Sequence, residues 1–402
     1  MSDYPALVDA ALRPELAALA AVDPDAAARR VRLMAKSALA FFRGAQPICV
    51  PWLVRKVGLD GTWAWTTGDA HHGNFATLAV GRADADGIVP VSYDVSDVDD
   101  EYPAPWRWDF VRLFASVALS KPGQKGSEFS ALVSTALDGY ARALEDAGEA
   151  RVDLADLPEA LKELIETDAG PQPYRQSLAE RIVGEGDDAR LKLGPEITKD
   201  LSARAFFLPA LTAAFGDDSR LAITDVARRA TSGVASLGRR RWLVCAKEKL
   251  GPRASRLRVI EIKERPASAL ARVLQVTPFV PAPGPAARLT VPMGGDPFQR
   301  VLHGPSESYL VRSRCHARKT LDPADLDAGD LSRLARLWGV LLANFHLRGL
   351  RALKADVPAR ASDIATEATE ARKDIARLAW EHAAFADKTY GAFRKLAREW
   401  QA

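Results

Sequence analysis

The sequence predicts a two-lobed α+β fold, with a helical lobe and a smaller antiparallel β lobe. Two observations predict it: helical patterns occupy both ends of the chain, and a strand-rich block of about 90 residues lies between them. The expected parts are a helical lobe with a few short strands, a β lobe, and helices that return to the helical lobe, at residues 1–221, 222–320 and 321–402. A chain of 402 residues is long enough for this organisation.

Apolar residues at helical spacing predict helices in three stretches, residues 1–45, 108–214 and 331–400. Segments rich in β-branched and aromatic residues predict short strands at residues 52–58, 62–67, 74–81 and 88–95. Alternating segments predict the strands of the β lobe between residues 222 and 314, around a Pro-rich loop at 278–287. Asp23 and Pro24 form an N-cap and first-turn pair, so a helix is expected to begin there.

Composition excludes several classes of protein. Hydrophobic residues make up 48% of the chain and charged residues 27%, as in ordinary globular proteins. No stretch approaches the roughly 18 consecutive apolar residues of a membrane span, and the N-terminus lacks the pattern of a signal peptide. The three cysteines are far apart and odd in number, which does not indicate a disulfide framework, so the cytoplasm is the expected compartment. A net charge of +3 gives no reason to expect a nucleic-acid partner.

The charges are unevenly distributed along the chain. Residues 84–109 contain eight acidic residues and one basic residue, whereas residues 228–265 contain twelve Arg or Lys against three Glu. One segment suits cations and the other suits anions, and a nucleotide–metal site requires both. The alternative is that both segments are solvated surfaces.

The sharpest local motif is the sequence GDAHHGN at residues 68–74, between two predicted strands. Asp69 and Asn74 suit phosphoryl transfer, because an Asp accepts the proton of an attacking hydroxyl and an Asn oxygen ligates a metal that bridges phosphates. A zinc or iron site at Asp69, His71 and His72 is the competing interpretation. Adjacent histidines on an extended strand point to opposite faces, which disfavours that metal site. A simple turn shaped by the glycines is the remaining alternative.

A second acidic motif, YDVSDVDD, follows about twenty residues later at the end of a predicted strand. Either Asp94 or Asp97 is expected to be a second metal ligand, and the sequence does not decide between them. Hard carboxylate oxygens favour Mg²⁺ or Mn²⁺.

Together these motifs resemble the paired signature of aminoglycoside-phosphotransferase-like kinases. The chain is more closely similar to the bacterial domain-of-unknown-function family 2252, which is placed in the protein-kinase-like superfamily. The matching stretches are KSALAFFRG, TTGDAHHGNF, YDVSDVDDEYPAPWRWDFVRLFAS, SGVASLGRRRWLV, VIEIKE, LVRSRC and WGVLLANFHLRG. The resemblance implies that Asp69 is the catalytic-loop Asp, that Asn74 binds metal, and that Asp109 braces the catalytic loop. Arg43, in the FRG motif, would clamp a phosphate or carboxylate, or else form a buried bridge to the acidic cluster.

A kinase also needs a glycine-rich hairpin over the phosphates and a strand lysine that binds them. Gly233, Ser236 and Gly238 lie in a segment whose composition resembles such a hairpin. Lys263 ends a predicted strand in which apolar and charged residues alternate. Ala235 replaces the central glycine of the loop, and no partner Glu for Lys263 is evident; the segment around His303 is where one would be sought. An ordinary hairpin is the alternative for this loop.

The order of these elements is unusual, since the glycine-rich loop and Lys263 follow the catalytic loop by about 160 residues. The helix at residues 331–346 resembles the one that normally leads into the catalytic loop, yet it lies near the C-terminus. The resemblance therefore implies a circularly permuted kinase fold, with this helix beside the segment that enters Gly68. His346 and four tryptophans, Trp63, Trp65, Trp106 and Trp108, are expected to be core residues.

The function expected from the resemblance is an ATP- and Mg²⁺-dependent phosphotransferase (Mn²⁺ being the alternative metal) that acts on an unidentified small-molecule or protein hydroxyl. Two alternatives are a pseudokinase or nucleotide-binding module with little turnover, and a nucleotidyl transferase on the same fold. The presence of both Asp69 and Asn74 favours catalysis, whereas Ala235 and the missing Glu favour the pseudokinase. Fold analogy does not identify the acceptor.

Overall fold

The computed structural model describes residues 3–79, 90–123, 126–215, 221–230, 239–250, 255–265, 268–274, 296, 298–304, 307–314 and 318–400. The predicted glycine-rich loop, with Gly233, Ser236 and Gly238, lies outside the described residues, and so does the Pro-rich loop.

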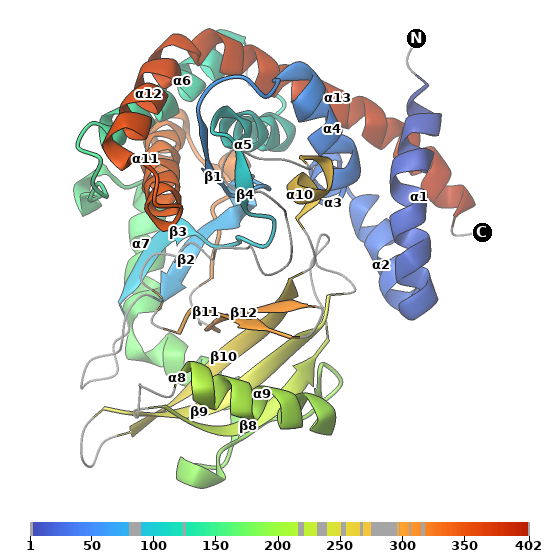
Figure 1. Cartoon of the computed structure of the whole chain (residues 1–402), viewed down its shortest axis with the longest axis vertical. Helices are drawn as coiled ribbons and strands as arrows, with labels where there is room; N and C mark the ends of the chain where they lie inside the picture. The colour runs from blue at the N-terminus through green and yellow to red at the C-terminus, as the bar shows by residue number, and fades with distance from the viewer. Residues whose placement is uncertain are drawn as a thin grey trace.

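The chain forms a mixed, mostly helical α+β structure with antiparallel sheets, which confirms the predicted class (Figure 1). Its helices are α1 (Tyr4–Val22), α2 (Pro24–Met34), α3 (Ala38–Gly44), α4 (Gln46–Lys56), α5 (Arg107–Ser120), α6 (Gly126–Leu144), α7 (Glu159–Ala169), α8 (Pro171–Arg181), α9 (Leu201–Ala214), α10 (Ala269–Val273), α11 (Ala328–Ala352), α12 (Val357–Glu370) and α13 (Arg372–Glu399). None of the helices in these ranges is both long and apolar enough to span a membrane.

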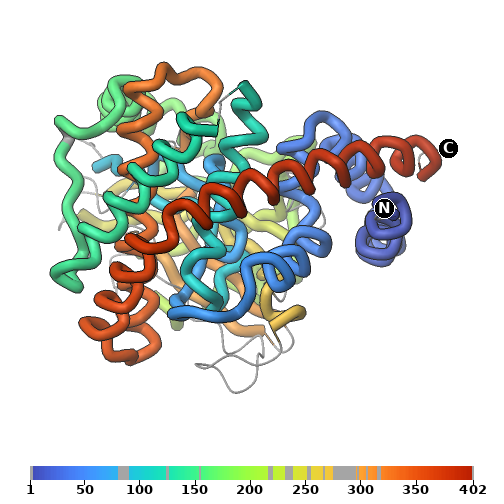
Figure 2. The backbone as a smooth tube through the Cα atoms, turned by 90° about the horizontal axis from the view of Figure 1, so that it is seen from above, coloured from blue at the N-terminus to red at the C-terminus, as the bar shows by residue number. Residues whose placement is uncertain are grey.

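Helices from both ends of the chain build one body. Helix α5 is buried along almost its whole length, and α13 crosses it and runs on to α1, so the first and last helices lie side by side (Figure 2). Helices α6 and α11 pack so closely that a Cβ built on Gly339 would lie only 2.0 Å from the Ala136 carbonyl oxygen. The buried rings of Trp65, Trp106 and Trp108 belong to this core, as the sequence predicted, whereas Trp63 is only partly buried.

Two small two-stranded sheets accompany the helical body (Figure 1). Strand β1 (Trp63–Thr66) pairs with β4 (Tyr102–Pro105), and β2 (Phe75–Ala79) pairs with β3 (Val91–Val95). The strand predicted at residues 52–58 is wrong, because most of that segment belongs to helix α4. Its apolar run is buried as a helix, and periodicity does not distinguish a short buried helix from a buried strand.

In the described part of the chain, the larger sheet has six antiparallel strands in the order β11-β12-β10-β9-β8-β7. They are β7 (Ile197–Lys199), β8 (Leu221–Arg229), β9 (Arg241–Lys249), β10 (Ser255–Arg265), β11 (Arg300–His303) and β12 (Ser308–Ser313); β5 (Ile182–Val183) and β6 (Arg190–Leu191) form a separate hairpin. Because β7 belongs to the sheet and α9 packs on β8, the sheet begins earlier in the chain than the predicted boundary at residue 222.

The two faces of this sheet differ in chemistry. Helix α9 covers one face, where Phe207, Trp242 and Ile262 belong to a separate apolar core. Since side chains alternate along a strand, Glu261 and Lys263 of β10 lie on the opposite face, which turns toward the helical body (Figure 1). The alternation of side chains along the strand therefore places charged groups at the boundary between the sheet and the helices.

Several contacts join the sheet to the helical body. Arg265 at the end of β10 forms a fully buried ion pair with Glu101, with Nη2 and Oε1 2.6 Å apart. Helix α10 follows and contacts α4, so Leu270 belongs to the helical core. Where the chain returns, the Lys319 Nζ lies 2.8 Å from Asp168 Oδ1.

Gly68 has a positive φ of +76°, and a Cβ built on it would lie 1.8 Å from the Asp100 carbonyl oxygen. We therefore expect Gly68→Ala to lower the free energy of unfolding by at least about 1–3 kcal/mol, the usual cost of one strained residue. Urea denaturation measures this loss. Gly148→Ala is the matched control, since its nearest neighbour is 3.8 Å away; equal stability of the two variants would contradict the predicted clash.

Candidate functional site

The segment that enters the GDAHHGN loop is held by a buried hydrogen-bond chain. Asp109 of α5 accepts hydrogen bonds from the Thr67 amide at 2.8 Å and the Thr67 hydroxyl at 2.9 Å. The same carboxylate accepts from His346 Nε2 at 3.1 Å, and His346 Nδ1 accepts from the Tyr140 hydroxyl at 2.6 Å. Asp109 thus lies where a bracing residue was expected, and α11 lies beside this segment as the sequence predicted.

Asp69 is buried and forms an ion pair with Arg112, whose guanidinium also lies over the Phe42 ring. Burial raises the pKa of Asp69 to about 7, even though Arg112 acts to lower it. The Asn74 Nδ2 donates to the Asp69 carbonyl oxygen at 2.8 Å, which closes the loop between the two residues. Within the described part of the chain, the Asn74 Oδ1 receives no hydrogen bond.

The structure separates the two candidates for the second acidic ligand. Asp94 faces a different cavity and pairs with Arg348 at 3.2 Å. Asp97 lines the same cavity as Asp69 and Asn74. Only Asp97 is therefore placed with the other predicted site residues.

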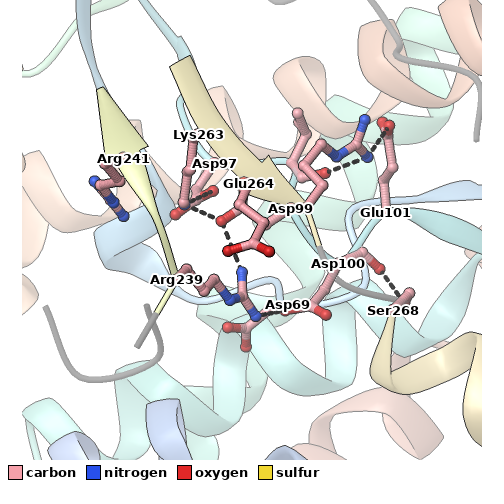
Figure 3. Close-up of polar contacts among 12 residues, drawn as sticks. Asp69, Asp97, Asp99, Asp100, Glu101, Arg239, Arg241, Lys263, Glu264 and Ser268 are labelled. Atoms are coloured by element: carbon pink, nitrogen blue, oxygen red, sulfur yellow. Dashed lines mark hydrogen bonds and ion pairs between the residues drawn. The ribbon is translucent and has the colours of Figure 1, made fainter. Parts of the chain in front are cut away.

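Lys263 is fully buried, and its Nζ lies 3.4 Å from Asp97 Oδ1 and also contacts Asp99 (Figure 3). Burial acts to raise the pKa of Asp97, but Lys263 and neighbouring arginines outweigh it and hold that pKa well below its usual range. The partner of Lys263 is thus found in the acidic motif, whereas His303 on β11 is exposed. The sequence did not predict the role of Asp99, because nothing in the motif YDVSDVDD shows which of its carboxylates contacts Lys263.

Arg239 is a second sheet-side cation at this boundary. Its guanidinium pairs with Asp99 at 2.9 Å and with Asp100 at 3.6 Å, and Figure 3 shows it reaching between these carboxylates. Arg239 and Lys263 therefore join the sheet to the acidic motif through ion pairs.

The two histidines of the loop point to different surroundings. His71 lines the cavity, and its buried Nδ1 has no hydrogen-bond partner among the residues that the structure describes. His72 lies against Ser116, with Nδ1 3.2 Å from the hydroxyl oxygen. Burial lowers the pKa of His72 to about 4. The described residues contain no group of three His, Cys, Asp or Glu side chains arranged to hold a metal ion.

The cavity between the sheet and the acidic motif has a volume of about 260 Å³. Its charged lining residues, four acids and six arginines, are Asp69, Asp97, Asp99, Asp100, Arg43, Arg229, Arg239, Arg241, Arg314 and Arg318. Arg43 approaches Gly73 and makes no ion pair with a described residue, so the bridge to the acidic cluster that the sequence offered as an alternative is not formed there.

A buried arginine cluster on the sheet was not predicted from the sequence. Glu261 is fully buried, and one of its oxygens pairs with Arg312 at 2.9 Å. Three further guanidiniums approach the same carboxylate, those of Arg229, Arg241 and Arg318. Burial acts to raise the pKa of Glu261, but these arginines hold it far below its usual range. Strand alternation placed Glu261 and Lys263 on one face, but the pairing of β8, β9 and β12 was needed to find the cluster.

These features define a mixed α+β protein with a charged cavity between its larger sheet and its helical body. The chain belongs to the family described as "Uncharacterized protein conserved in bacteria (DUF2252)", which it matches over residues 22–189 and 209–396. No curated protein matches the chain. No solved structure matches it either.

Proposed function

We propose that this protein is an ATP- and Mg²⁺-dependent phosphotransferase that acts on a hydroxyl group. The observation that carries the proposal is that Asp69, Asn74 and Asp97 line one cavity, while Lys263 contacts Asp97 from the sheet. Residues this far apart in the sequence share one site only because the sheet docks against the acidic motif.

Each residue has a chemical role in this proposal. Asp69 accepts the proton of the acceptor hydroxyl, the acceptor oxygen bonds to the γ-phosphorus, and the bond from that phosphorus to the β-phosphate oxygen breaks, releasing ADP. The Asn74 Oδ1 and the Asp97 carboxylate are hard oxygen donors that suit Mg²⁺ and would hold it. When bound, the metal neutralises charge on the phosphates. Lys263 exchanges its contact with Asp97 for a phosphate oxygen.

The same proposal includes a circularly permuted kinase-like fold. Its support is the position of α11, which lies beside β1 although it follows the sheet in sequence. The hydrogen bond from His346 to Asp109 joins this late helix to the brace of the catalytic loop. Both end helices, α1 and α13, pack on the helical body, as a permutation would require.

The lining of the cavity indicates which part of the nucleotide it holds. Ala76 is the only apolar side chain among its described lining residues. A nucleobase binds between apolar surfaces, whereas phosphates bind to arginine and lysine. The cavity therefore suits the phosphates and the metal, and the base lies outside it.

A second candidate, a nucleotide-binding module without turnover, is favoured by one observation. Both predicted functional charges are already neutralised, Asp69 by Arg112 and Lys263 by Asp97 and Asp99. A site of this kind binds a ligand only if the ligand outcompetes the internal ion pairs. Measurement of turnover separates the two candidates.

We expect ATP with Mg²⁺ to raise the melting temperature of the purified protein, because a ligand that binds only the folded state stabilises it. Asp97→Asn should remove the dependence of this shift on Mg²⁺. Asp94→Asn is the matched control, since Asp94 is also a buried, arginine-paired carboxylate but faces the other cavity.

Differential scanning fluorimetry with ATP, with and without Mg²⁺, makes the comparison directly. A shift that keeps its Mg²⁺ dependence in Asp97→Asn would assign the metal to other residues. The absence of any shift at millimolar nucleotide would argue against both candidate functions.

A further inference from the structure

Three cations stand in a row across neighbouring strands of the larger sheet. Lys263 of β10 is directly opposite Arg241 of β9, and Arg241 is directly opposite Arg229 of β8. Like charges at directly opposed positions of a sheet repel one another and destabilise it. A row of this kind on a buried face therefore calls for compensating anions.

Glu261 supplies only part of the compensation. Its one carboxylate is shared by four arginines, and the contact with Arg241 is long, at 3.4 Å. Arg314 also lines the cavity and makes no ion pair with a described residue, and the buried Nε atoms of Arg241 and Arg314 have no hydrogen-bond partner. Burial lowers the pKa of Arg314 to about 9 and that of Arg318 to about 10.

The charge of the whole site can be counted from the residues that line the cavity and those paired directly to them. Among the described residues these are eight cations and five carboxylates: Arg43, Arg112, Arg229, Arg239, Arg241, Lys263, Arg314, Arg318, Asp69, Asp97, Asp99, Asp100 and Glu261. ATP with one bound Mg²⁺ carries a net charge of about −2, which neutralises about two thirds of the excess. About one positive charge then remains without a partner, and unpaired buried charge is costly.

We propose that the acceptor is itself an anion, a hydroxyl compound that carries a phosphate group, and that Arg241, Arg314 and Arg318 bind this group. The inference rests on the proposed function and names the class of its acceptor. A phosphate monoester carries about −1.5 to −2 at neutral pH and presents three acceptor oxygens, one for each of these arginines, whereas a carboxylate presents only two. Guanidinium groups also bind phosphate in bidentate geometry.

The test uses the full-length protein saturated with Mg²⁺ and a non-hydrolysable ATP analogue, titrated with inorganic phosphate in a calorimeter. Phosphate is expected to bind while the nucleotide stays bound, and acetate is expected to bind much more weakly. Arg314→Gln should weaken phosphate binding by about tenfold or more, the effect of one charge-assisted hydrogen bond. Arg240→Gln is the matched control, because Arg240 pairs with Glu264 and Glu307 and does not line the cavity.

The outcomes separate this inference from the proposed function. If the nucleotide binds but phosphate does not, or if phosphate only competes with the nucleotide, the arginines bind the phosphates of ATP. This inference is then overturned, while the proposed function stands. Equal affinity of acetate and phosphate, or an unchanged affinity in Arg314→Gln, overturns it as well. If the nucleotide does not bind, the proposed function fails and this inference fails with it.

Discussion

Asp69→Asn is expected to slow phosphate transfer from ATP by about 10²–10⁴-fold, the usual contribution of a general base. The substitution keeps the size of the side chain and removes its ability to accept a proton. In the proposed mechanism Asp69 contacts the acceptor. The affinity for ATP with Mg²⁺ should change little, because the substitution leaves Lys263 and Asp97 at the proposed metal site unaltered. ADP formation, measured with a mixture of bacterial metabolites as acceptors, gives the rate.

Asp94→Asn is the control that matches Asp69→Asn most closely. Each wild-type carboxylate is buried and paired with an arginine: Asp94 with Arg348, which is 11% exposed, and Asp69 with the buried Arg112. Only Asp69 lines the charged cavity. Equal losses of activity in both variants would indicate damage to the fold. If the wild type binds nucleotide but forms no ADP with any mixture, the module without turnover becomes the better account.

Glu261→Gln is expected to lower the free energy of unfolding by about 3–5 kcal/mol, the cost of leaving buried charges without their partner. Glutamine has nearly the same shape as glutamate, so the loss reports charge. Arg229, Arg241 and Arg312 would then lie together without an internal carboxylate. Urea denaturation in a buffer without multivalent anions measures the change.

Glu264→Gln on the same strand is the control for this prediction. Glu264 pairs with Arg240, which is 40% exposed, and an exposed pair is worth about 0–1 kcal/mol. Added phosphate should restore part of the stability of Glu261→Gln, since it supplies the missing negative charge. A stability within about 1 kcal/mol of wild type would show that solvent already screens the arginines.

Most of the helical body followed from periodicity in the sequence. The long amphipathic stretches at α6, α11 and α13 are distinctive because apolar residues recur at helical spacing over many turns. Helix α4 was mistaken for a strand because its apolar run is short and continuous. The early start of the sheet was missed because β7 has only three residues, too few for alternation to be visible.

Part of the site followed from motifs and part required the fold. The sequence singled out Asp69 and Asn74, which line one cavity, because their spacing lies within one loop. It left Asp94 and Asp97 undecided, since the direction of a side chain beyond the end of a strand depends on tertiary packing. It did not find Glu261 and its arginines, because that cluster comes from separate strands whose pairing is not encoded in any local pattern.

The ion pairs between the sheet and the acidic motif also have a consequence for the order in which the protein is made. Glu101 and Asp97 leave the ribosome well before their partners Arg265 and Lys263, which follow 164 and 166 residues later. The hydrogen bond between Asp109 and His346 forms later still, because these residues are 237 positions apart. A nascent chain therefore carries the acidic motif for much of its synthesis without the counter-charges that allow it to be buried. The proposed catalytic region is consequently among the last parts of the molecule to reach its final form, and a truncated chain contains these acidic residues without forming the charged cavity.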